Sequence, residues 1–291
     1  MKEIVIISGK GGTGKTSVAA ALACVSPQPI VVADCDVDAS DMHLILKPDN
    51  QHSEDYYSGV KALIDPALCT NCGVCAQICR FDAITLKNGS HLVNQLDCEG
   101  CGYCQLVCPV SAITTPTQKV GRVHKAITRI GFPLVHAKLD IGADNSGKLV
   151  AKVKRDARAL AEQHQCQYIL VDGSPGIGCP VISSLSGADL VILVTEPSRS
   201  GLEDMKRVWE LARRFDLKAA CVINKADLNP GLTAEIHTFL KSHRISLLAE
   251  LPYHQDFTAA ITQAVSLVEY DPQEWKHIFQ SIWDRILMEL K

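Results

Sequence analysis

The sequence has little that would direct the protein to a membrane or to nucleic acid. It contains no apolar run of about 18 residues, the length that a membrane-spanning helix needs. Its formal net charge is −3, so no excess of basic residues points to nucleic acid. The first residues form an apolar, β-rich run rather than a signal peptide. We therefore expect a cytoplasmic protein with no membrane span and no nucleic-acid partner.

The composition indicates an ordinary globular protein with one exception. Of its 291 residues, 47% are hydrophobic and 21% are charged, which is typical of a soluble globular chain. This length is enough for a full α/β core and one small additional domain. The exception is the content of 13 cysteines. Because disulfides are rare in the cytoplasm, these cysteines predict metal binding.

A glycine-rich segment near the start predicts a phosphate-binding loop. Residues 3–8 before it are apolar and β-rich, and residues 17–23 after it are rich in alanine, so the segment joins a strand to a helix. In this context a G-x-x-x-x-G-K-[ST] sequence presents backbone N–H groups and a helix N-terminus to phosphates. Lys15 is expected to reach the β- and γ-phosphates, and Thr16 to bind Mg²⁺. The expected nucleotide contacts from this segment are Gly9, Lys10, Gly11, Gly12, Thr13, Gly14, Lys15, Thr16 and Ser17.

Carboxylates follow two apolar runs that are typical of buried parallel strands, residues 29–34 and 168–172. Asp172 ends the second run, where an apolar strand can present a carboxylate to Mg²⁺. Asp34 ends the first run and Asp36 follows two residues later. Since α/β sheets bind ligands at the carboxyl ends of their strands, we expect all three carboxylates near the phosphate loop.

Eight of the cysteines form two matched runs that repeat after about 29 residues. Zinc motifs usually consist of two cysteine pairs with a longer spacer, which these runs do not resemble, and thiolates also suit iron–sulfur clusters. The other five cysteines lie in apolar contexts and are expected to be small buried residues, with Cys179 as the exception because it follows a predicted switch loop. The matched runs are Cys69, Cys72, Cys75 and Cys79, then Cys98, Cys101, Cys104 and Cys108.

The spacing of these runs resembles that of two-cluster bacterial ferredoxins, in which the fourth cysteine of each run binds the other cluster. The resemblance implies two [4Fe–4S] clusters in a small inserted domain. Arg80 stands where the first run would usually carry proline. One implied ligand set is Cys69, Cys72, Cys75 and Cys108, and the other is Cys98, Cys101, Cys104 and Cys79.

The phosphate loop, with its early lysine Lys10, resembles that of the MinD/ParA/nitrogenase-iron-protein superfamily. The resemblance covers residues 1 to about 50 and about 165 to 291, and superfamily members with an inserted ferredoxin domain extend it to essentially the whole chain. It implies an ATP-dependent homodimer in which Lys10 crosses to the partner's nucleotide. It also implies that Asp34 belongs to the Mg²⁺ shell with Thr16 and Asp172, and that Asp36 orients the attacking water. The expected catalytic residues are Lys10, Lys15 and Asp36.

Two segments are candidates for recognition of the base. Residues 224–227 read N-K-x-D, a sequence that selects guanine in GTPases because its carboxylate accepts from guanine N1 and N2. The superfamily resemblance instead implies adenine, with Asn224 as the base contact and Pro252 in the segment that closes the other side. We expect ATP and leave GTP open.

The expected fold class is α/β: a doubly wound, mostly parallel P-loop NTPase sheet with an inserted small α+β ferredoxin-like domain. Residues 1–58 and 118–291 would form the ATPase domain and residues 59–117 the insert. Residues 48–60 read as a linker and residues 120–139 as a β-hairpin. The last helix, from about residue 272, has an apolar stripe and mixed charges, which favours packing on the sheet over membrane binding.

Two functions remain open at this point. The first is an iron–sulfur protein that hydrolyses ATP. In it, nucleotide-driven changes of the dimer and of its switch loops would gate either electron transfer or the assembly and delivery of metal clusters. The recipient would be a redox or metallocluster partner protein. The second is a MinD/ParA-type positioning ATPase with structural or redox-sensing clusters. Both rest on analogy with the superfamily. The eight cluster cysteines and the mixed-charge last helix favour the first.

Overall fold

The computed structural model describes residues 1–140, 142–143 and 146–291, which form two compact units. The first unit comprises Met1–Glu54, Arg122–Leu139 and Ser146–Lys291, and the second comprises Asp55–Gly121 and Asp140–Asn145. The sequence predicts the insert at residues 59–117. The second unit therefore begins a few residues earlier than expected and includes a short piece of chain after residue 139.

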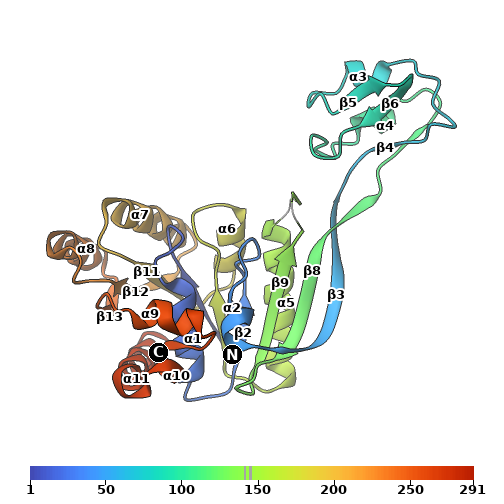
Figure 1. Cartoon of the computed structure of the whole chain (residues 1–291). Helices are drawn as coiled ribbons and strands as arrows, with labels where there is room; N and C mark the ends of the chain where they lie inside the picture. Colours follow the sequence, from blue (N-terminus) through green and yellow to red (C-terminus); the bar gives the residue numbers. More distant parts are fainter. Residues whose placement is uncertain (141, 144–145) are drawn as a thin grey trace. The chain divides into compact units, whose positions relative to one another are not determined.

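The first unit is built on a nine-stranded sheet with the strand order β13-β12-β11-β1-β10-β2-β9-β8-β3 (Figure 1). The pairs from β13 to β9 are all parallel, as expected for a doubly wound sheet. The strands are β1 (Lys2–Ile7), β2 (Ile30–Asp34), β3 (Asp49–Val60), β8 (Thr117–Ile127), β9 (Pro133–Leu139), β10 (Tyr168–Asp172), β11 (Leu190–Thr195), β12 (Lys218–Asn224) and β13 (Ser246–Leu251).

Helices cover both faces of this sheet (Figure 1). On one face, alternate residues such as Ile4 and Ile6 of β1 share a buried core with Trp275 and Trp283 near the C-terminus. This face carries α1 (Lys15–Cys24), α2 (Met42–Leu46), α9 (Asp256–Thr262), α10 (Leu267–Tyr270) and α11 (Pro272–Glu289). The other face carries α5 (Ser146–Gln163), α6 (Cys179–Leu185), α7 (Arg199–Arg214) and α8 (Pro230–His243).

The last helix, α11, packs on the sheet as the sequence predicts. Its stripe of Trp275, Phe279, Ile282, Trp283 and Ile286 is at most 1% exposed. The Trp283 indole N–H also donates to the Leu22 carbonyl of α1 at 2.7 Å, so the helix is fixed in the core. Among the helices that the structure describes, none is both long and apolar enough to cross a membrane.

The prediction of a linker at residues 48–60 is wrong, because this segment forms the twelve-residue strand β3. Its polar composition hid the strand: β3 is the edge of the sheet, where charged and polar residues are common. The predicted hairpin is confirmed, since β8 and β9 are neighbours and the Thr128 N–H donates to the Phe132 carbonyl at their turn. The two short helices α9 and α10 were not expected.

The second unit contains two small antiparallel pairs of strands and two single-turn helices. Strand β4 (Leu63–Ile64) pairs with β7 (Ile113–Thr114), and β5 (Ile84–Lys87) pairs with β6 (Ser90–Val93). The helices are α3 (Val74–Gln77) and α4 (Tyr103–Leu106). The unit's small core is formed by Ala62, Cys75, Ile84, Cys104 and Ile113.

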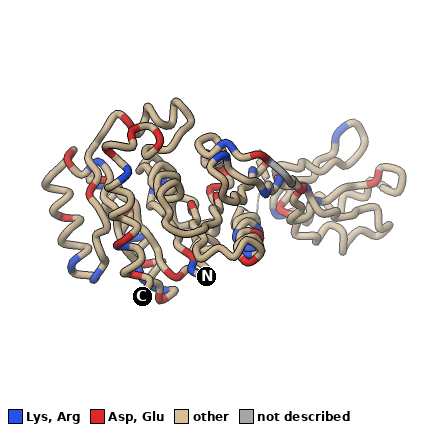
Figure 2. The backbone as a smooth tube through the Cα atoms, turned by 90° about the horizontal axis from the view of Figure 1, so that it is seen from below, with Lys and Arg blue, Asp and Glu red and all other residues tan. Residues whose placement is uncertain are grey.

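Acidic and basic residues are interspersed along the described chain (Figure 2).

Candidate functional site

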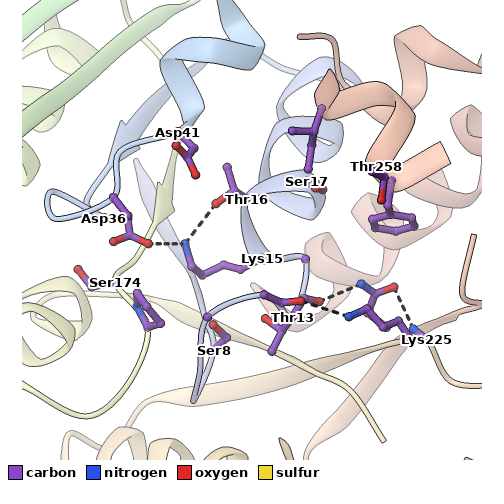
Figure 3. A pocket seen from close by; sticks show the side chains of 18 of the residues that line it. Ser8, Thr13, Lys15, Thr16, Ser17, Asp36, Asp41, Ser174, Lys225 and Thr258 are labelled. Atoms are coloured by element: carbon purple, nitrogen blue, oxygen red, sulfur yellow. Dashed lines mark hydrogen bonds and ion pairs between the residues drawn. The ribbon is translucent and has the colours of Figure 1, made fainter. Parts of the chain in front are cut away.

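The glycine-rich segment forms the turn between β1 and α1, as predicted from its strand and helix context (Figure 3). Gly14 precedes the helix with a φ of 91°, a conformation that favours glycine. A Cβ atom at this position would also stand 2.4 Å from Nδ2 of Asn224. Gly14 is therefore required both by its backbone conformation and by the close approach of the Asn224 side chain.

Lys15 is buried among the predicted carboxylates. Its Nζ lies 2.6 Å from Oδ1 of Asp172 and 3.6 Å from Oδ2 of Asp36. Burial opposes the charged form, but the carboxylates of Asp172 and Asp36 raise the pKa of Lys15 above its ordinary value. The Thr16 hydroxyl donates to the other oxygen of Asp172 at 2.8 Å. The structure thus brings together four of the predicted catalytic and Mg²⁺ residues.

Asp34 stands beside this group, because it is the partner of Asp172 in the parallel ladder between β2 and β10. Its carboxylate accepts from the Ser40 hydroxyl at 2.7 Å and from the Asp36 N–H at 3.1 Å. Complete burial, together with the neighbouring charge of Asp172, raises the pKa of Asp34 to about 7. Two buried carboxylates side by side form an acidic pair whose repulsion a divalent cation would relieve.

A cavity of about 590 Å³ opens beside the phosphate loop, a volume within the usual range for small-ligand sites. It is lined by Gly11, Gly12, Thr13, Gly14, Lys15, Thr16, Ser17, Asp36 and Asn224 from the predicted site. The predicted residues Gly9, Lys10, Asp34, Asp172 and Pro252 do not line it. Asp34 and Asp172 lie just behind the cavity. Asp34 contacts Asp36, and Asp172 contacts Lys15 and Thr16.

At the other end of the cavity, Asn224 is held by the phosphate loop. Its Nδ2 donates to the Thr13 carbonyl at 2.9 Å and its Oδ1 accepts from the Lys225 N–H. Asp227, the carboxylate of the N-K-x-D segment, accepts from the Tyr253 N–H at 2.6 Å and does not line the cavity. Sequence reasoning missed three other lining residues of the short helix α9, which gave no recognisable motif: Phe257, Thr258 and Ile261.

Lys10 points to its own chain rather than into the cavity. Its Nζ lies 2.6 Å from Oε1 of Glu196 and donates to the hydroxyls of Ser198 and Ser200. Glu196 also pairs with Lys225 at 2.7 Å, and Lys225 Nζ donates to the Gly12 carbonyl. The carboxylate of Glu196 therefore joins Lys10 of the phosphate loop to Lys225, which follows β12.

The second unit contains a separate set of chemically active residues. Its eight cysteines line two cavities with four cysteines each, and all 13 cysteines of the chain are free thiols. The two groups correspond to the ligand sets that the ferredoxin resemblance implies. The first cavity, of about 10 Å³, is lined by Cys69, Cys72, Cys75 and Cys108, and the second, of about 380 Å³, by Cys79, Cys98, Cys101 and Cys104.

The described residues contain no group of three or more His, Cys, Asp or Glu side chains placed to hold a single metal ion. This finding applies to the cysteine cavities as well as to the carboxylates around Lys15. Of the five scattered cysteines, Cys35, Cys166 and Cys221 are buried as expected, Cys24 is half-buried and Cys179 is exposed.

Two relatives in Methanocaldococcus jannaschii are similar to this chain over most of their length. The uncharacterized protein MJ0578 is 36% identical over 230 residues, which cover 78% of this chain and 79% of that protein. The uncharacterized protein MJ0579 is 27% identical over 245 residues, which cover 81% of this chain and 87% of that protein. Neither name states a function.

Solved structures of MinD proteins share the fold. MinD of Pyrococcus horikoshii, complexed with Mg-ADP, has a TM-score of 0.60 at 19% identity, covering 98% of this chain and 95% of that chain. MinD in the MinC:MinD complex of Aquifex aeolicus has a TM-score of 0.60 at 16% identity, covering 99% and 96%. The CobQ/CobB/MinD/ParA nucleotide binding domain matches residues 4–267. The chain therefore belongs to this nucleotide-binding family, whose MinD and ParA members are ATPases.

Proposed function

We propose that this MinD/ParA-type ATPase couples its nucleotide cycle to two [4Fe–4S] clusters in its second unit. The observation that carries the proposal is the division of eight cysteines between two cavities with four in each. Cys79 and Cys108, the last cysteines of the two runs, each join the cavity of the other run. Two-cluster ferredoxins exchange their fourth ligand in the same way.

The residues present fit such clusters. Ligands of a single ion must all lie about 2.0–2.3 Å from one point, whereas the four thiolates of a cluster bind four different irons and stand further apart. The lack of a single-ion site among the described residues is therefore compatible with clusters. The cysteine side chains around the smaller first cavity would have to turn outward. When bound, the clusters would supply one-electron chemistry.

In the first unit we propose roles that follow the contacts around Lys15. Thr16, Asp34 and Asp172 would hold Mg²⁺, since hydroxyl and carboxylate oxygens are the ligands that Mg²⁺ prefers. Lys15 would exchange its ion pair with Asp172 for the nucleotide phosphates, and Asp36, at the cavity wall, would orient the attacking water. Residues 9–17 would cradle the phosphates, and Lys10 would reach the nucleotide of a partner chain in an ATP-dependent homodimer.

We propose that the base end of the cavity takes adenine rather than guanine. Guanine selection by an N-K-x-D segment needs its aspartate at the base, but Asp227 lies outside the lining, with Oδ1 accepting from the Tyr253 N–H. Asn224 remains the proposed base contact, because it lines the cavity. Pro252 is exposed and outside the lining, so we propose that the neighbouring Tyr253 and Phe257 of α9 close the other side instead.

Two uses of the coupling remain candidates. Gated electron transfer, or cluster delivery to a redox or metallocluster partner protein, rests on the cysteine cavities. The comparisons agree better with the alternative, a MinD/ParA-type positioning ATPase with sensory or structural clusters, since the similar structures are MinD and ParA-type ATPases. One feature opposes membrane positioning through α11, because its apolar stripe is already buried in the core.

Chemical analysis of anaerobically purified protein tests the proposal. Two clusters require about eight iron and eight sulfide per chain, with absorbance in the 400 nm region. Near-stoichiometric zinc without that absorbance would contradict it. Sedimentation with anionic liposomes or plasmid DNA, with and without ATP, then separates the two uses. ATP-dependent co-sedimentation supports positioning, and its absence supports the redox or cluster-delivery function.

A further inference from the structure

Lys225, the lysine of the N-K-x-D segment, is held beside the phosphate loop (Figure 3). Its backbone has a φ of 57°, a conformation that is uncommon for a residue other than glycine. The N–H of Lys225 donates to Oδ1 of Asn224 at 2.9 Å, and its Nζ donates to the Gly12 carbonyl at 3.3 Å. Contacts at both ends of the residue therefore keep its charge next to the loop.

The carboxylate of Glu196 is shared by two lysines, one at each oxygen. Oε1 lies 2.6 Å from Nζ of Lys10, and Oε2 lies 2.7 Å from Nζ of Lys225. The Glu196 side chain is 16% exposed, so its charge would be more costly to leave without a partner than a charge at the open surface. Because the two ammonium groups repel each other, each one weakens the net attraction of the other to this carboxylate.

Glu196 would keep partners if Lys10 left it. Lys225 would still pair with Oε2, and the Ser198 hydroxyl, which donates to Oε1 at 3.4 Å, would remain at the other oxygen. Without Lys225, the departure of Lys10 would leave a partly buried carboxylate with no compensating charge. Repulsion before the departure and compensation after it have the same sign, because both make Lys10 easier to release when Lys225 is present.

We propose that Lys225 is a positioning residue that releases Lys10 from Glu196 toward the partner chain of the ATP-dependent dimer. This inference rests on the proposed function, since it requires that Lys10 reach a partner's nucleotide. Lys225 stays on its own phosphate loop and takes over the charge of Glu196. In a single chain Glu196 holds both lysines, and in the dimer it would hold Lys225 alone.

Sedimentation velocity of the full chain tests the inference, in an Asp36→Ala parent that slows hydrolysis. ATP affinity is measured for each variant first, so that every chain is saturated. Lys225→Met should lower the dimerisation constant by about two- to fivefold, the range of a partly exposed ion pair. Lys225→Arg keeps the charge and should dimerise as the parent does. Lys206→Met, which removes the lysine of an exposed pair with Glu203, is the matched control and should change nothing.

A double variant separates this role from a structural one. If Lys225 acts through Glu196, adding Lys225→Met to Glu196→Gln should change the dimerisation constant no further. If Lys225 only shapes the phosphate loop through the Gly12 carbonyl, the same loss should appear with and without the Glu196 charge, which would overturn the inference. An unchanged or higher dimerisation constant in Lys225→Met alone would overturn it as well.

The outcomes distinguish this inference from the proposed function. A parent chain that forms no dimer with ATP, or a dimer that Lys10→Ala leaves unchanged, would overturn the proposed role of Lys10 and the inference with it. A dimer that requires Lys10 but does not respond to Lys225→Met would overturn the inference alone. Should Lys225→Met fail to fold, Lys225→Gln, which keeps a hydrogen-bond donor, takes its place with the same expected loss.

Discussion

The Nζ atom of Lys10 lies 2.6 Å from Oε1 of Glu196 in the same chain, although Lys10 is the residue proposed to reach a partner's nucleotide. Both side chains are largely buried, at 29% and 16% exposure. Glu196 also pairs with Lys225, so the pKa of its carboxyl stays below the ordinary value, with the two lysines opposing the effect of burial. The contact within the chain and the contact across a dimer would therefore compete for Lys10.

Glu196→Gln should shift this competition toward the dimer. The substitution removes the negative charge that holds Lys10 within its own chain. Ion pairs of this exposure contribute about 0.2–1 kcal/mol, which corresponds to a change of up to roughly fivefold in the dimerisation equilibrium. We expect a higher dimer fraction with ATP in sedimentation velocity, using an Asp36→Ala background to slow hydrolysis. Glu203→Gln, which removes an exposed pair with Lys206, is the control. An unchanged or lower dimer fraction in Glu196→Gln would count against the competition.

Lys10→Ala and Lys15→Ala should separate dimer formation from nucleotide binding. Lys15→Ala removes a charge-assisted contact to phosphate, which is worth about 1.5–3 kcal/mol, so nucleotide affinity should fall by roughly 10- to 100-fold. Lys10→Ala should bind nucleotide as wild type but lose ATP-dependent dimerisation and turnover. Calorimetric affinities and phosphate release measure both effects. Normal turnover in Lys10→Ala would rule out its role across the interface.

Cys79→Ser should damage the second cluster rather than the first. Cys79 follows the first run in sequence but lines the cavity of Cys98, Cys101 and Cys104. Cys108→Ser should correspondingly damage the first cluster. Double variants test which cysteines share a cluster. The variant with both Cys79→Ser and Cys101→Ser should lose only the second cluster, as Cys79→Ser alone does. The variant with both Cys79→Ser and Cys72→Ser should lose both clusters. Iron counts that instead follow the sequence runs would refute the exchanged ligands.

The buried residue His136 should make the first unit sensitive to acid. It stacks between His43 and His124, with ring centroids 5.4 and 4.7 Å away, and burial lowers the pKa of His136 to about 3. Between its unfolded pKa of about 6.5 and 3, only the unfolded chain takes up this proton, so stability falls as the pH falls. The expected loss is about 2 kcal/mol between pH 7 and 5. Urea unfolding measures it, and His136→Phe should reduce the loss.

The phosphate loop and the parallel sheet could be predicted because their signals are local. Gly14 and Lys15 stand at fixed places between a strand and a helix, and buried strands such as β10 read as continuous apolar runs. The grouping of Cys79 and Cys108 with the opposite runs is what the resemblance to two-cluster ferredoxins implies.

The rest depended on contacts between distant parts of the sequence. Glu196 meets Lys10 across 186 residues, and neither residue carries a motif for this pair. The polar strand β3 forms because its backbone pairs at the sheet edge, which side-chain patterns do not reveal.

Nucleotide affinity in two redox states tests the coupling of ATP to the clusters most directly. The chain enters the second unit through β3, shortly after Asp36, and leaves it through β8, so a nucleotide that orders the segment around Asp36 can act on the second unit through the chain. We predict that the ATP affinity of Asp36→Ala protein differs between the dithionite-reduced and the oxidised state by about 1–3 kcal/mol. A difference of about 1.4 kcal/mol corresponds to a tenfold change in affinity. ATP binding should shift the cluster potential by the same free energy. Equal affinities and unchanged potentials on adding nucleotide would contradict the account.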